Sequence, residues 1–97
     1  MKEFLFKKKG FNIYLEELLE DLPIEDCVDI PEIIKQVNND ELNYFCARII
    51  AEKLDLELGD CYSGCIIGDL HLELQHEMAD EAIINAEEKI KELSEQP

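Results

Sequence analysis

The sequence predicts an all-α domain, a small bundle of three to four helices with an antiparallel helical hairpin at its C-terminal end. Three observations support this prediction. Apolar or small residues follow the a/d spacing of a heptad from residue 72 to residue 93. Apolar residues recur at helical spacing within 12–21 and 41–57. The stretch 29–32 (Asp-Ile-Pro-Glu) is a helix start, with an acidic cap and a proline in the first turn.

The last helix is expected over residues 61–94, and the other elements are expected to pack around it. Its heptad seam comprises Leu72, His76, Ala79, Ile83, Ala86, Ile90 and Leu93. A second stripe, in steps of four, comprises Ile66, Leu70, Leu74, Met78, Ala82 and Ala86. At 1.5 Å per residue this helix is about 50 Å long, against about 25 Å for its neighbour. Either Gly64 and Gly68 interrupt it, or its excess length pairs with a second chain.

Two short segments, 54–58 and 69–75, conflict with this prediction because their apolar and polar residues alternate as in a strand. Their apolar residues are all leucine, without the β-branched types that suit a sheet. The heptad also continues through the second segment. We therefore predict helix, with a small hairpin as the alternative.

The remaining elements are predicted in chain order. Residues 1–11 are a basic and apolar segment, either a short hairpin that turns at Lys9-Gly10 or a tail before a helix. Its lysines are expected to dock on the acidic body, to dock on a second subunit, or to fray. Helices are then expected over 12–21, stopped by Pro23, over 30–38, and over 41–57, ended by Gly59.

The composition indicates one strongly acidic domain spanning residues 1–97. The net charge is −15, from 24 acidic and 9 basic residues. Such a charge argues against direct binding of nucleic acid or of an anionic membrane, and it favours a basic protein partner. The partner could be a nucleic-acid-binding protein, in which case the acidic surface would mimic nucleic acid. The alternative is that the charge only keeps a small protein in solution.

The four cysteines bear on the expected compartment. No secretory signal is evident, and no stretch approaches the roughly 20 apolar residues of a membrane span. We therefore expect a cytoplasmic protein with reduced thiols. Arg48, the one arginine, is expected to lie at the surface or to pair with a carboxylate of the last helix.

The motifs for chemistry are weak, and neither an enzyme nor a cofactor is expected. Glu73 and His76 form a Glu-x-x-His pair on one helix face, the pair that carboxylate-bridged metal sites use twice. Only one copy is present, so a metal-binding homodimer is an alternative rather than the leading hypothesis. Cys61 and Cys65 do not have the spacing of a redox motif or of a complete zinc site.

The leading functional hypothesis is a non-enzymatic protein-binding module, of the inhibitor, immunity or adaptor type, that acts as a homodimer. A further alternative is a structural subunit of a larger assembly. The binding surface is expected on exposed carboxylates of the last helix: Glu73, Glu77, Asp80, Glu81, Glu87 and Glu88.

Overall fold

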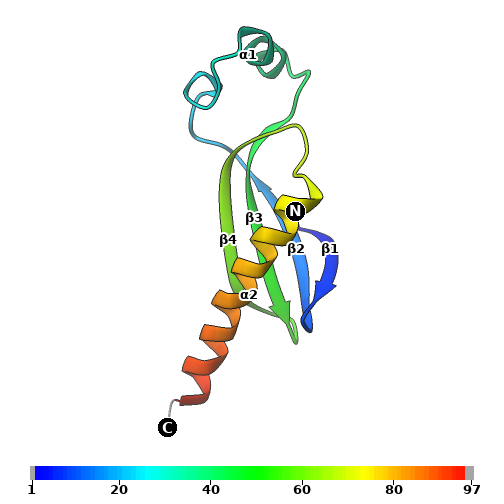
Figure 1. Cartoon of the computed structure of the whole chain (residues 1–97), viewed down its shortest axis with the longest axis vertical. Helices are drawn as coiled ribbons and strands as arrows, with labels where there is room; N and C mark the ends of the chain where they lie inside the picture. Colours follow the sequence, from blue (N-terminus) through cyan, green and yellow to red (C-terminus); the bar gives the residue numbers. More distant parts are fainter. Residues whose placement is uncertain (1, 96–97) are drawn as a thin grey trace.

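The computed structural model describes residues 2–95 and shows a four-stranded antiparallel sheet with one long helix across it (Figure 1). The strands β1 (Lys2–Lys8), β2 (Phe11–Leu18), β3 (Tyr44–Lys53) and β4 (Leu56–Ile67) lie side by side in chain order. The helical elements are η1 (Ile24–Asp26), α1 (Pro31–Asn38) and α2 (Leu72–Glu95). The prediction of an all-α helical bundle is therefore wrong: the domain is a sheet covered by a helix.

Two-residue turns close both hairpins of the sheet. Lys9 and Gly10 join β1 to β2, with φ of 51° and 82°. Leu54 and Asp55 join β3 to β4, with φ of 54° and 63°. Positive φ at both central residues is the requirement of a type I′ turn, whose twist matches the strands that it connects. Of the two alternatives for residues 1–11, the hairpin at Lys9-Gly10 is confirmed.

Along β2 and β3, apolar residues that face α2 alternate with residues that face the opposite side of the sheet. Phe11, Ile13 and Leu15 of β2 are buried toward α2, and so are Phe45, Ala47, Ile49 and Ala51 of β3. The predicted helices 12–21 and 41–57 are both wrong, because these residues pair in a ladder from Asn12–Glu52 to Leu18–Cys46. A strand brings every second residue to one face, which suffices to build this core.

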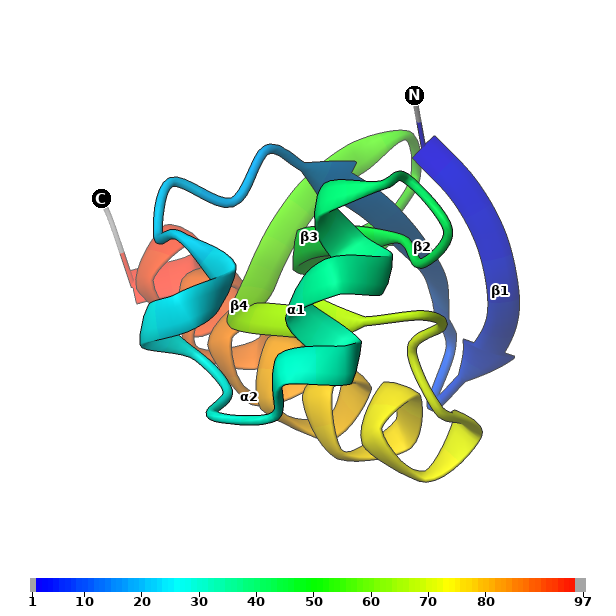
Figure 2. The same ribbon diagram turned by 90° about the horizontal axis from the view of Figure 1, so that it is seen from above.

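Helix α2 lies on the inner face of the sheet, as the view along the long axis shows (Figure 2). It begins eleven residues later than predicted, at Leu72 rather than residue 61, because residues 61–67 belong to β4. Gly68, with φ of 80°, marks the break between strand and helix. The predicted helical hairpin is therefore a strand followed by a helix. The predicted stripes still describe its buried face, which comprises Met78, Ala79, Ala82, Ile83 and Ala86.

Residues 19–43 form an excursion between β2 and β3 that carries η1 and α1. Helix α1 matches the predicted helix 30–38 closely. None of its residues is buried, and it lies at the end of the molecule opposite the C-terminal end of α2 (Figure 1). The molecule is elongated, with extents of 55 × 23 × 22 Å.

Candidate functional site

The outer face of α2 carries five of the six carboxylates predicted to bind a partner. Glu73, Glu77, Glu81 and Glu88 point away from the sheet at helical spacing, and Glu87 lies at the flank of this row. All five are exposed. Within residues 2–95 none of the five forms an ion pair. The outer face therefore presents unneutralised charge over about 16 Å between Glu77 and Glu88.

Ile84 lies within this acidic row and was not predicted as part of the site. Its side chain is 49% exposed although it belongs to the central turns of the helix. A large apolar side chain surrounded by carboxylates resembles the centre of a protein interface, where an apolar core has a polar rim. The signal was present in the sequence, because Ile84 fits neither of the two buried stripes.

Asp80, the sixth predicted residue, is occupied by a contact within the chain. Its Oδ1 lies 2.8 Å from Nζ of Lys8 on β1. The hydrogen bond from Lys8 lowers the pKa of Asp80. Asp80 therefore fastens the first hairpin to α2, and its membership of the partner surface stays a prediction. Of the three alternatives for the N-terminal lysines, Lys8 follows the first, docking on the acidic body of the protein.

His76, the candidate metal ligand, also contacts β1. Its ring stacks on Phe6 at a centroid separation of 4.3 Å, and Nδ1 lies 3.2 Å from Nζ of Lys8. Glu73 is exposed to solvent one turn earlier. In the described part of the chain no group of three or more histidine, cysteine, aspartate or glutamate side chains is placed to hold a metal ion. The geometry gives the Glu73–His76 pair a structural use, in which His76 packs β1 against α2.

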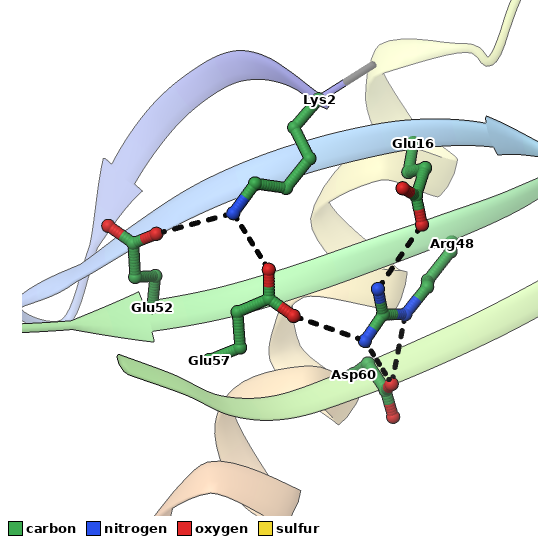
Figure 3. A network of polar contacts seen from close by, with 6 residues as sticks. All are labelled: Lys2, Glu16, Arg48, Glu52, Glu57 and Asp60. Carbon is green, nitrogen blue, oxygen red and sulfur yellow. Dashed lines mark hydrogen bonds and ion pairs between the residues drawn. The ribbon is translucent and has the colours of Figure 1, made fainter. Parts of the chain in front are cut away.

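The face of the sheet opposite α2 is covered by its own charged side chains (Figure 3). Arg48 on β3 is the centre of this network. Its guanidinium lies 3.0 Å from Asp60, 3.2 Å from Glu16 and 3.4 Å from Glu57. Lys2 extends the network from β1 and bridges Glu57 at 2.7 Å and Glu52 at 3.5 Å. Ion pairs thereby connect all four strands, and the partners of Arg48 come from the sheet rather than from the last helix.

Protonation equilibria follow from these contacts. Burial alone would lower the pKa of Arg48, but the hydrogen bonds to Asp60 and Glu16 outweigh it and raise that pKa above its ordinary value. The hydrogen bond from Lys2 lowers the pKa of Glu57.

The two cations of the network also lie over aromatic rings of the same face. Lys2 lies 5.0 Å from the ring centroid of Tyr14, and Arg48 lies 5.9 Å from that of Tyr62. Each of the four carboxylates of this network therefore contacts a cation, in contrast to the carboxylates on the outer face of α2.

We expect replacement of Arg48 by methionine to lower the free energy of unfolding by about 1–2 kcal/mol. The change keeps an apolar stem but leaves Glu16 and Asp60 without the cation that pairs them, and leaves Glu57 with Lys2 alone. Removing one partner of a fully buried pair costs about 3–5 kcal/mol, and partial exposure of these groups reduces that cost. Urea denaturation measures the change. Lys35→Met is the control, because Lys35 is exposed on α1; a loss no larger than that of the control would contradict the prediction.

The cysteines depart from the expected reduced state. Cys27, next to η1, forms a disulfide with Cys65 on β4. The hydroxyl of Tyr44 donates to the carbonyl oxygen of Leu22 at 2.6 Å, and the backbone amide of Cys65 donates to Glu20 at 2.8 Å. These contacts fasten the excursion to the sheet. A disulfide is typical of oxidising compartments, so the cytoplasmic assignment loses its thiol argument and stays a prediction.

Cys46 and Cys61 are free thiols. Burial raises the pKa of both, and neighbouring carboxylates raise it further: Glu20 and Asp21 act on Cys46, and Glu81 and Asp60 act on Cys61. Both thiols therefore stay protonated near neutral pH, whereas a cysteine nucleophile needs its thiolate form.

Comparison with known proteins finds no match: no family model, no curated protein and no solved structure matches the chain. Within residues 2–95, no helix combines the length and the apolar character needed to cross a membrane. The functional argument therefore depends on the surfaces of this molecule alone.

Proposed function

We propose that this protein is a binding module whose acidic α2 surface engages a basic patch on a partner protein. The observation that carries the proposal is the contrast between the two exposed faces. Carboxylates of the sheet face are paired with Arg48 and Lys2, whereas Glu77, Glu81 and Glu88 have no cationic partner within residues 2–95. Unpaired charge along one helix attracts a partner of opposite sign and accelerates its association.

The partner class follows from the arrangement of this surface. Carboxylates spaced along one helix face, at about 6 Å for one turn, suit lysine and arginine side chains that lie along a groove or a helix. Proteins that bind nucleic acids present such basic patches. Ile84, exposed in the middle of the row, adds an apolar contact that gives the interface an orientation.

The test compares two variants with the same net charge. Glu77→Gln/Glu81→Gln/Glu88→Gln neutralises the proposed surface, and Glu25→Gln/Glu32→Gln/Glu41→Gln neutralises three exposed carboxylates of the excursion. Glutamine has nearly the same helix propensity as glutamate, so α2 stays folded. Immobilised wild-type and variant proteins are used to capture partners from cell extract, and the affinity of any captured protein is then measured at several salt concentrations.

We expect a partner retained by the wild type and by the excursion variant, with an affinity that falls about tenfold or more for the α2 variant and falls steeply with salt. Ile84→Gln is expected to weaken the same complex without changing its salt dependence. Equal retention by both triple variants would show that the outer face of α2 is not the interface.

A further inference from the structure

An apolar groove lies at the end of the molecule opposite α1, between the β3–β4 turn and the last turns of α2. It encloses about 510 Å³. Its lining comprises Lys53, Leu54, Leu56, Leu58, Ile90, Leu93 and Ser94. Four of the apolar side chains are unusually open to solvent for their size: Leu54 at 86%, Leu56 at 58%, Leu93 at 52% and Ile90 at 38%. Gathered apolar exposure of this kind marks an interaction surface, whereas single exposed leucines do not.

The groove exists because α2 continues past the sheet. The helix extends beyond the strands at its C-terminal end (Figure 1), so Ile90 and Leu93 continue its buried seam where no strand covers them. The radius of gyration is 15.8 Å, compared with about 12.5 Å for a compact domain of this length. Both the excursion at one end and the overhang of α2 at the other contribute to this elongation, and the overhang leaves the seam longer than the core that one copy of the chain provides.

Leu54 has a backbone conformation that is unfavourable for leucine. It lies at the tip of a type I′ turn with φ of 54°, where asparagine or glycine is the usual residue and a large side chain is strained. Within its own chain the side chain is almost fully exposed. Only a contact outside the chain would give this side chain the burial that its own fold does not.

Charge distinguishes this end from the outer face of α2. Helical geometry places Glu87 and Lys89 at the two flanks of the Ile90–Leu93 seam, and the turn contributes Lys53 and Asp55. A two-fold interface joins one patch to itself and must be self-complementary. A rim of both signs satisfies this condition, whereas the carboxylates of the outer face would repel their own copy.

We infer that a second copy of this chain covers the groove in a two-fold dimer, with the Leu54 tip of each copy packed against Ile90 and Leu93 of the other. The inference uses a different surface from the proposed partner site. Both surfaces are free at the same time, so each dimer presents two acidic α2 faces to its partners and gains avidity from them.

The test is the mass of the protein in solution, measured by sedimentation equilibrium over a range of concentrations. We expect the wild type to approach twice 11.2 kDa as the concentration rises through the micromolar range typical of modest interfaces, to about 100 μM. Leu54→Asn is expected to raise the dimer dissociation constant at least about tenfold. The same change relieves the turn, because asparagine tolerates positive φ, so the melting temperature of the monomer stays equal or rises.

Leu93→Gln tests the helix side of the groove and is expected to raise the dissociation constant by a similar factor. Leu19→Asn is the matched control: Leu19 is 88% exposed but lies beyond β2, near the opposite end of the sheet. A monomer mass at about 100 μM, well above the range of stable dimers, would overturn the inference. A dimer unaffected by both groove variants would also overturn it, because the copies would then meet elsewhere. Neither result bears on the binding surface of α2.

Discussion

Replacement of Gly59 by alanine is expected to lower the free energy of unfolding by about 3 kcal/mol. Gly59 lies on β4 under α2. A Cβ atom there would collide with the carbonyl oxygen of Ala82 and the amide nitrogen of Ala86, and would lie 2.9 Å from Cα of Ala86. These are backbone atoms of the helix, so no rotamer change relieves the clash and the helix must move.

The direction of this effect opposes strand propensity, which favours alanine over glycine, and valine over both. Gly64→Ala is the matched control on the same strand. Its new methyl group would approach the carboxylate of Glu20 rather than backbone atoms. That side chain can shift at the expense of its hydrogen bond from the Cys65 amide, so the loss is expected to stay below about 1.5 kcal/mol. Urea denaturation followed by circular dichroism compares the two variants. Similar losses for both would mean that α2 does not lie directly on Gly59.

The close approach at Gly59 explains the small residues of the core. Ala47 and Ala51 on β3 and Ala79, Ala82 and Ala86 on α2 are all fully buried. Side chains this small let the helix axis come close to the sheet, and larger ones would hold it off. From the sequence alone, Gly59 is expected to end a helix, and Ala79, Ala82 and Ala86 are expected to belong to helical stripes.

The incorrect helix over 41–57 has a specific physical cause. Strand β3 alternates Phe45, Ala47, Ile49 and Ala51 toward α2, but Ile50 on the opposite face is also fully buried. The network around Arg48 and Lys2 lies on that same face of the sheet (Figure 3). A polar residue is the usual choice at such an outward position, but β3 has Ile50 there. The run Ile49-Ile50-Ala51 then hides the period of two and permits a helical interpretation.

The parts that were predicted correctly depend on local signals. Pro31 marks the start of α1, although the N-cap is Ile30 rather than the predicted Asp29. Lys9-Gly10 marks a hairpin, which was one of two alternatives, and the heptad marks α2. The parts that were missed depend on contacts between distant residues. Lys8 meets His76 across 68 positions, and Arg48 meets Glu16 across 32. No periodicity along the chain encodes which charges become paired, so the contact between Lys8 and Asp80 could not be predicted from the sequence.

Removal of the Cys27–Cys65 disulfide is the second change with a large expected effect. Cys27→Ser/Cys65→Ser is expected to lower the free energy of unfolding by about 3–4 kcal/mol, because the bond closes a loop between residues 38 positions apart and so restricts the unfolded chain. The matched control, Cys46→Ser/Cys61→Ser, changes the two free thiols and is expected to cost less than about 2 kcal/mol. A reductant added to the wild type should reproduce the first loss and leave the first variant unaffected.

Two possible roles of this disulfide differ in which residues lose stability when the bond is removed. Without it, residues 19–43 keep the bond from Tyr44 to Leu22, the bond from Cys65 to Glu20, and the buried side chain of Ile24. Helix α1 itself buries no residue, so hydrogen exchange in 24–38 is expected to accelerate well before exchange in the strands does. Uniform acceleration across the sheet would contradict this expectation, because the disulfide would then stabilise the whole domain rather than the attachment of its excursion. In either case the groove lies at the end of the molecule opposite α1, and neither cysteine of the bond lies on α2, so binding at both surfaces should survive reduction.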